Sequence, residues 1–249
     1  MFSPADWHQR FAIQASWTRD MRQYLIERMR LPAAARCLEV GCGTGALLQD
    51  GSLPTHACLY GADINREYLR LSRKKNLSTT HIQADGFHLP FACDSFHLAY
   101  CHYLLLWLAD PLAVLEEMRR VTQPGGWVAT FAEPDYGGRI DSPPPLDELG
   151  RLQTLALRAQ GADPLMGRRL LEIFHQAGFG NIQSGVIGAQ WSGSSIASDT
   201  NSEEKILLHD LANLLPADRL TALLQVNREA CSNGRRVLYL PTFYAIAQV

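Results

Sequence analysis

The sequence predicts an α/β fold with a doubly wound, mostly parallel sheet of about seven strands. Short apolar runs alternate with helical patterns, which is typical of parallel strands joined by crossover helices. The chain has 249 residues, 47% hydrophobic and 19% charged, a composition that suits a globular domain with a sizeable core. No repeat, low-complexity tract or linker divides it. We therefore expect one domain over residues 1–249.

The N-terminal part, residues 1–35, is expected to form a helical cap ahead of the first strand. Between Phe11 and Arg30, apolar residues such as Ile13, Trp17 and Met21 recur at a spacing that places them on one helix face. This pattern predicts an amphipathic helix that packs on the sheet.

Seven apolar runs predict the strands. In chain order they are Arg36–Val40, Ala57–Ala62, Thr80–Ala84, Phe96–Cys101, Trp127–Ala132, Asn181–Gln190 and Arg236–Ala247. A helix is expected between the fourth and fifth strands, with Asp110 as its N-cap and Pro111 in its first position. Pro124 and Gly125 end it.

Residues 199–234 stand outside this alternation and predict two leucine-rich helices, the second closed by Asn233 and Gly234. An insertion this late in a sheet can cover a ligand pocket, or it can pack on the sheet edge without touching a ligand. We treat the segment as a candidate substrate lid, and both interpretations stay open.

Composition excludes several classes of partner. The net charge of −2 and the scattered arginines give no basic surface for nucleic acid. The longest apolar window, Leu98 to Ala109, is too short to span a membrane, and the N-terminus lacks a secretory signal, so we expect a cytoplasmic protein. Six cysteines without a C-x-x-C pair and eight unclustered histidines predict no metal site.

The motif "EVGCGTG", Glu39–Gly45, carries the strongest functional signal. Gly41, Gly43 and Gly45 lack the Cβ that would hold a ligand away from the backbone, and Glu39 places a carboxylate just upstream. A tight strand-to-helix turn without a ligand stays open as an alternative. The motif otherwise indicates a ligand that tolerates both glycines and a negative charge.

Two ligands compete for this motif. The dinucleotide fingerprint G-x-G-x-x-G has its third glycine one residue later, and Glu39 would repel the phosphates. S-adenosylmethionine has no phosphate and carries a positive ammonium and a positive sulfonium, which a carboxylate favours. The residues therefore favour S-adenosylmethionine.

The same stretch resembles the first motif of the class I S-adenosylmethionine-dependent methyltransferases, in particular their small-molecule members. The match continues in "LPFACDSFHLAY" and "VLEEMRRVTQPGGWVATFAEP", which are similar to the family's fourth and fifth strands with their approaches. The resemblance covers roughly Arg36 to Pro134. It implies a Rossmann-like sheet with a cofactor-binding core over residues 36–135. His97 departs from the Asp of many family members and affects local hydrogen bonding.

The resemblance implies S-adenosylmethionine as the cofactor. Asp63, eighteen residues past Gly45, resembles the acidic residue that accepts hydrogen bonds from both ribose hydroxyls. Asp85 resembles the side chain that receives the adenine amino group. The expected cofactor-binding residues are Glu39, Gly41, Cys42, Gly43, Gly45, Asp63, Ile64, Asp85, Gly86, Phe87 and His102.

Methyl transfer from a sulfonium chiefly needs an aligned acceptor in a dry pocket, so a catalytic side chain is not required. Candidates come from loops after the fourth and fifth strands, where ligands bind in such sheets. His102 is the first candidate general base and Glu133 the second, but His102 could also only line the pocket. Tyr103, Tyr136 and Arg139 are candidate substrate contacts, with a solvated loop as the alternative for the last two.

We therefore expect a methyltransferase that acts on a small, fairly apolar molecule through an oxygen or carbon acceptor. Asn-Pro-Pro-Tyr and Pro-Cys motifs are missing after the fourth strand, which disfavours nucleic-acid substrates. Trp17 and Arg22 could close over the methionine end, although Trp17 also fits a core position. The alternatives are a cofactor-binding module without catalysis and a nicotinamide-dependent oxidoreductase. The sequence does not predict an oligomeric state.

Overall fold

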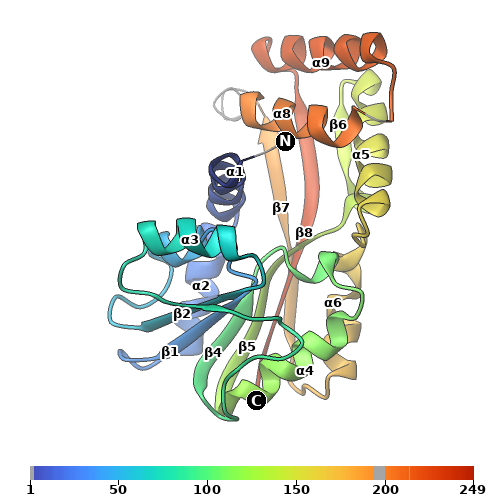
Figure 1. Ribbon diagram of the computed structural model, residues 1–249. Helices are drawn as coiled ribbons and strands as arrows, with labels where there is room; N and C mark the ends of the chain where they lie inside the picture. Colours follow the sequence, from blue (N-terminus) through green and yellow to red (C-terminus); the bar gives the residue numbers. More distant parts are fainter. Residues whose placement is uncertain (1–2, 193–199, 213) are drawn as a thin grey trace.

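The computed structural model describes residues 3–192, 200–212 and 214–249, and over these residues the strands form one eight-stranded sheet (Figure 1). The sheet order is β3-β2-β1-β4-β5-β8-β6, and β7 pairs with the other edge of β8. The strands are β1 (Arg36–Val40), β2 (Cys58–Asp63), β3 (Thr80–Gln83), β4 (Phe96–Cys101), β5 (Thr122–Pro134), β6 (Ile140–Ser142), β7 (Gln183–Ser192) and β8 (Val237–Gln248).

The connections are mostly helical. The α-helices are α1 (Pro4–Trp17), α2 (Arg19–Met29), α3 (Arg66–Lys75), α4 (Pro111–Val121), α5 (Asp147–Ala159), α6 (Met166–Gln176), α8 (Thr200–Leu211) and α9 (Ala217–Ser232). Short 3₁₀ turns are η1 (Leu47–Gln49), η2 (Leu105–Trp107), η3 (Tyr136–Gly138) and η4 (Pro144–Leu146). Asp110 caps α4 by accepting a hydrogen bond from the Ala113 N–H at 3.1 Å, as predicted.

Strands β1 to β5 pair in parallel, whereas β8 runs antiparallel to β5, β6 and β7. This arrangement confirms the predicted doubly wound, mostly parallel sheet. The prediction lacked β6, because three residues between two short turns are too few to show an alternating pattern.

The sheet is buried on both faces. Along β4, Leu98 and Tyr100 pack with α1 and α2, whereas Ala99 and Cys101 pack with α4 and α6. Successive side chains of a strand point to opposite faces, so a strand covered on both sides reads as a continuous apolar run. This explains why few polar residues interrupt the run from Phe96 to Cys101.

The N-terminal segment forms two helices instead of the single predicted helix. It begins earlier than predicted because Ser3 and Asp6 form a capping box, with Pro4 in the first helical position. The break falls at Thr18, where the backbone leaves helical geometry (φ −108°, ψ 3°), and α2 starts at Arg19.

The late part of the chain extends the sheet beyond the core. In Figure 1, β7 and β8 run upward past the end of β5 toward α8 and α9. There β6 takes over the edge of β8 that β5 has left. Helices α5, α8 and α9 share a leucine-rich cluster. The two helices predicted within residues 199–234 thus pack on each other and on α5, and residues 199 and 213 lie outside the described residues.

Candidate active site

The glycine loop leaves the carboxyl end of β1. Gly41, Gly43 and Gly45 have φ of 71°, 51° and 74°, the left-handed region that glycine adopts without steric cost. A Cβ at Gly45 would collide with Ser72 Oγ and lie 2.6 Å from Asn76 Nδ2. The glycines therefore allow a sharp turn that packs closely on α3.

Asp63, the last residue of β2, faces this loop. One carboxylate oxygen accepts a hydrogen bond from the Gly43 N–H at 2.7 Å, and the other accepts from the Asn65 N–H at 2.7 Å. Burial raises the pKa of Asp63, although these two N–H donors counteract it. Each oxygen keeps acceptor capacity beyond its backbone partner, so both can still receive ribose hydroxyls.

Glu39 lies on β1 below the loop and is 3% exposed. Its carboxylate accepts a hydrogen bond from the Tyr100 hydroxyl at 3.3 Å. Burial, reinforced by the charge of Asp50, raises the pKa of Glu39 well above its usual 4.5. The nearby Arg22 lowers this pKa in part but forms its ion pair with Asp50. A ligand ammonium would stabilise the buried carboxylate.

Thr18 joins the N-terminal helices to the loop after β4. Its hydroxyl lies 2.9 Å from His102 Nε2 and also accepts a hydrogen bond from Arg22 Nη1. Burial, with the charge of Arg22, lowers the pKa of His102 well below 6.5. The His102 imidazole is therefore neutral at pH 7. Arg22, 1% exposed, acts as an internal anchor beneath the loop.

The remaining residues of the expected cofactor set differ in exposure. Asp85 is exposed and accepts a hydrogen bond from the Phe87 N–H at 3.1 Å. A Cβ on Gly86 would lie tightly against the core, and Phe87 packs on that core. Ile64 is 67% exposed, beside the loop that follows β2. The Cys42 side chain is buried in a cluster with Leu48 and Leu69, so it is the backbone of Cys42 that can face a ligand.

Glu133, the second candidate base, has a different role in this structure. Its two oxygens accept hydrogen bonds from the N–H groups of Leu104, Leu105 and Leu106 at 2.9, 2.7 and 3.1 Å. Burial raises its pKa to about 8 even though these N–H groups counteract the effect. Glu133 thus fixes the loop that carries His102.

The three candidate substrate residues do not share one environment. Tyr103 follows His102 with φ 53°, and it packs against the same apolar core as Tyr136. Tyr136 packs in the same apolar cluster as Trp17. Arg139 is instead held by Asp141, at 2.7 and 3.1 Å, in an ion pair that is almost fully buried. Tyr103 and Tyr136 therefore lie together, while the guanidinium of Arg139 is engaged in the fold.

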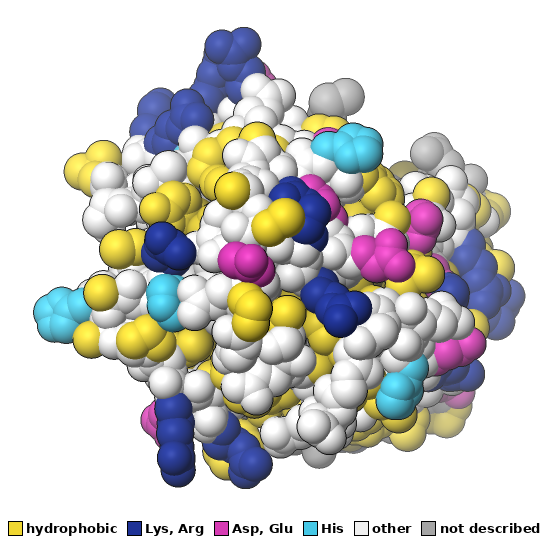
Figure 2. Space-filling view, turned by 90° about the horizontal axis from the view of Figure 1, so that it is seen from below, with side chains coloured by type: hydrophobic (Ala, Val, Ile, Leu, Met, Phe, Trp, Pro, Cys, Tyr) yellow, Lys and Arg dark blue, Asp and Glu magenta, His cyan; other side chains and the backbone are white. Residues whose placement is uncertain are grey.

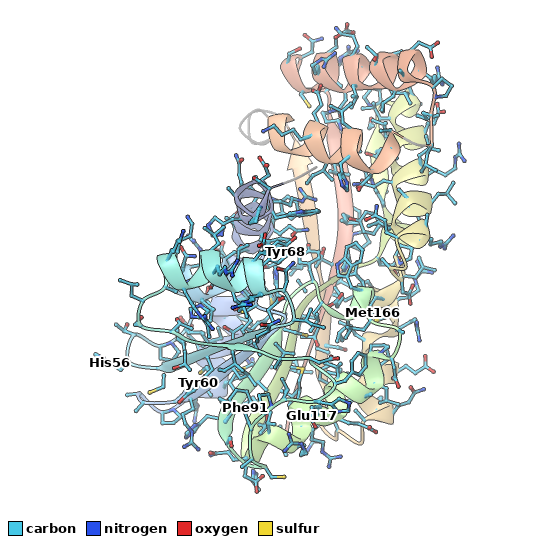
Figure 3. All side chains as sticks on the ribbon, in the orientation of Figure 1. His56, Tyr60, Tyr68, Phe91, Glu117 and Met166 are labelled. Atoms are coloured by element: carbon cyan, nitrogen blue, oxygen red, sulfur yellow. The ribbon has the colours of Figure 1, made fainter. Side chains whose placement is uncertain are left out.

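Helix α1 brings residues to the site that the sequence analysis missed. His8 Nδ1 lies 2.9 Å from Thr44 Oγ1, and a Cβ on Gly43 would meet the Phe11 ring at 3.2 Å. Phe11 also contacts Tyr68 edge-to-face, with ring centroids 5.9 Å apart, and Figure 3 shows Tyr68 on the side of α3 nearest α1. Recognising the Ser3 capping box would have extended the predicted helix to His8.

The surface carries mixed charge. Figure 2 shows Lys and Arg side chains interspersed with Asp, Glu and apolar side chains on one face of the molecule. In the part of the chain that the structure describes, no helix has the length and apolarity to cross a membrane. Among the same residues, His, Cys, Asp and Glu side chains do not gather in groups that could hold a metal ion.

The comparisons with known proteins match the part of the chain that contains strands β1 to β5. A family model for a methyltransferase domain matches residues 38–130. The methyltransferase GfsG of Streptomyces halstedii is 33% identical over 115 residues, covering 44% of this chain and 41% of that protein. The malonyl-[acyl-carrier protein] O-methyltransferase of Erwinia pyrifoliae is 32% identical over 114 residues, covering 46% and 43%. This chain thus aligns with less than half the length of these relatives.

A solved structure extends the likeness to most of the chain. Phosphoethanolamine N-methyltransferase 2 of Haemonchus contortus, in complex with S-adenosyl-L-methionine, superposes with a TM-score of 0.58. The match covers 92% of this chain and 52% of that one at 14% identity, so it shows a shared fold.

Proposed function

This chain belongs to the class I S-adenosylmethionine-dependent methyltransferases, and from that premise we propose that it transfers a methyl group to a small, fairly apolar molecule. One arrangement supports the proposal most. The glycine loop, the doubly anchored Asp63 and the buried Glu39 meet at the carboxyl ends of β1 and β2. Ligands bind at this edge in doubly wound sheets.

The residues fit the cofactor along its length. Asp63 would accept the ribose hydroxyls, and Asp85 with Phe87 would receive the adenine. Glu39 would hold the ammonium, because a buried carboxylate with a raised pKa is stabilised in its charged form by a cation. The bound cofactor supplies an electrophilic methyl group on a positive sulfur.

The chain's task is then to align an acceptor and exclude water. His102, Tyr103 and Tyr136 lie together around the loops after β4 and β5. Alignment alone can lower the barrier by about 7 to 11 kcal/mol, which corresponds to roughly 10⁵- to 10⁸-fold in rate. A general base typically contributes roughly 10²- to 10⁴-fold, so alignment is the larger effect. An oxygen or carbon acceptor with an easily lost proton suits this site, because the pKa of His102 is lowered and Glu133 is held by three N–H groups. The Erwinia relative named an O-methyltransferase supports the oxygen acceptor.

A cofactor-binding module without catalysis is the second candidate. The same weak basicity of His102 and the full engagement of Glu133 favour it, and a fold does not by itself fix an activity. Under either function, residues 199–234 remain a candidate substrate lid. Trp7 of α1 contacts His209 of α8 at 6.1 Å between ring centroids, so the cap and this segment meet.

Methyl transfer can be tested directly. Protein is incubated with methyl-labelled S-adenosylmethionine and a metabolite extract, and labelled products are counted beside Asp63→Ala. We expect a labelled small molecule that the variant forms more slowly. Binding of the cofactor without any labelled product would favour the non-catalytic module. Binding of NAD in place of the cofactor would favour an oxidoreductase.

A further inference from the structure

Arg10 is a half-buried cation without an acidic partner among the described residues. Its guanidinium carbon lies 5.0 Å from the centroid of the Trp17 ring, and none of the hydrogen bonds or ion pairs of the described residues involves its side chain. Two arginines that are almost fully buried have acidic partners: Arg22 pairs with Asp50, and Arg236 with Asp141. A partly desolvated guanidinium is stabilised by a hydrogen-bonded anion, so the vacant donors of Arg10 indicate a ligand.

The position of Arg10 on α1 separates it from the cofactor loop. Arg10 and Trp17 are two helical turns apart and share one flank, whereas His8, two residues before Arg10, points to nearly the opposite flank. His8 lies on Thr44 of the cofactor loop. Trp17 packs with the late strand β8. In Figure 1, α1 lies between α3 and the upper part of β7 and β8. Arg10 therefore lies on the flank of α1 that faces β8, away from the cofactor loop.

The Trp17 ring that contacts Arg10 belongs to an aromatic and apolar cluster. Trp17 and Tyr136 pack with Leu238 and Leu240 of β8. Burial raises the pKa of the Tyr103 phenol, and the positive charge of Arg10 lowers it in part. Tyr103 directly follows His102, at the carboxyl end of β4. Arg10 thus lies near the expected transfer site, beside apolar walls.

We propose that Arg10 binds a carboxylate of the methyl acceptor, so that the substrate is an acid with an apolar body. The planar guanidinium offers two parallel N–H donors that match a carboxylate, and the cation–π contact with Trp17 at 5.0 Å helps to hold its position. The apolar body would lie along Trp17, Tyr136 and β8. The carboxylate would orient the acceptor and would not itself be methylated. This inference rests on the proposed methyltransferase function.

The rival ligand for Arg10 is the carboxylate of the cofactor's own methionine. The two can be separated, because only the rival requires Arg10 for cofactor binding. Arg10→Gln removes the charge, and Arg10→Lys keeps it without the planar fork. Arg28→Gln is a matched control, because Arg28 stacks on Tyr24 at 5.5 Å on the exposed surface of α2. Thermal unfolding checks that each variant is folded.

The experiment combines calorimetry with product analysis. Affinity for S-adenosylhomocysteine is measured for each variant, and labelled products from the metabolite extract are separated by anion exchange at neutral pH. We expect label in the acidic fraction, reduced roughly ten- to a hundredfold by Arg10→Gln and less by Arg10→Lys. Affinity for S-adenosylhomocysteine should not change, and Arg28→Gln should behave as wild type.

Three results would overturn the inference. A labelled product in the neutral or cationic fraction, formed equally by wild type and Arg10→Gln, would show that the acceptor has no carboxylate. The methyltransferase function would still stand. Weaker S-adenosylhomocysteine binding by Arg10→Gln would assign Arg10 to the cofactor. Label in no fraction, even with wild-type protein, would contradict the methyltransferase function and the inference with it.

Discussion

The cofactor end of the sheet and the late extension hold their polar groups in different ways. At the cofactor end, two carboxylates are anchored by backbone N–H groups: Asp63 by Gly43 and Asn65, and Glu133 by the turn after β4. In the extension, side chains pair with side chains across long stretches of sequence. Asp141 binds Arg236, 95 residues away. Where backbone N–H groups hold a carboxylate, we expect its substitution to affect ligand binding. Where side chains pair across the chain, we expect a substitution to affect stability.

This contrast predicts that the largest loss of stability comes from the extension. Asp141 neutralises two buried guanidiniums, those of Arg139 and Arg236. Asp141→Asn removes the negative charge that both guanidiniums contact and should lower the free energy of unfolding by about 3–5 kcal/mol. Urea unfolding measures this loss of free energy. Glu67→Gln, in the exposed pair with Arg70, is the control and should lose less than about 1 kcal/mol. Equal losses would remove the contrast.

The second-largest loss of stability should come from the glycine loop. Gly45→Ala introduces a Cβ at positive φ that also collides with Ser72, and we expect a loss of about 2–4 kcal/mol in unfolding free energy. Gly51 has nearly the same φ, 73°, with open space around it. Gly51→Ala therefore isolates the backbone strain and should lose about 1–2 kcal/mol. If the two variants unfold alike, packing against α3 does not require the glycine.

The backbone-anchored carboxylate should affect binding more than stability. Asp63→Ala removes charge-assisted hydrogen bonds and frees Gly43, so affinity for S-adenosylhomocysteine should fall roughly ten- to a hundredfold. Asp85→Ala should reduce it less, because Asp85 is exposed. Calorimetry on folded protein compares them. A larger loss of affinity for Asp85→Ala than for Asp63→Ala would show that the adenine contact contributes more to binding than the ribose contact.

The smallest effect is expected for His102. Its imidazole is neutral well below pH 6.5, so turnover should not fall as the pH drops from 8 through 6.5 on account of this residue. His102→Ala should reduce turnover by less than about a thousandfold, because alignment is the larger contribution. Thr18→Val removes the partner of His102 as a control. A larger loss, with the acidic limb of the pH profile abolished, would make His102 the base.

The same contrast explains which parts of the structure the sequence could predict. The positions of the first five strands, the cap at Asp110 and the glycine turn depend on neighbours in sequence, and the structure confirms them. The break at Thr18 and the Arg236–Asp141 pair depend on contacts that no local pattern records. Likewise, the aromatic surroundings of Arg10 involve β8, far along the chain, so the sequence pattern did not identify this residue.

The central claim is that the carboxyl ends of β1 and β2 hold S-adenosylmethionine. The most direct test is calorimetric titration of the wild-type protein with S-adenosylhomocysteine, S-adenosylmethionine, NAD and NADP under the same conditions. We predict saturable binding of the two adenosyl ligands and no heat of binding with either dinucleotide. Saturable binding of NAD or NADP, with no response to S-adenosylhomocysteine or S-adenosylmethionine, would contradict the claim.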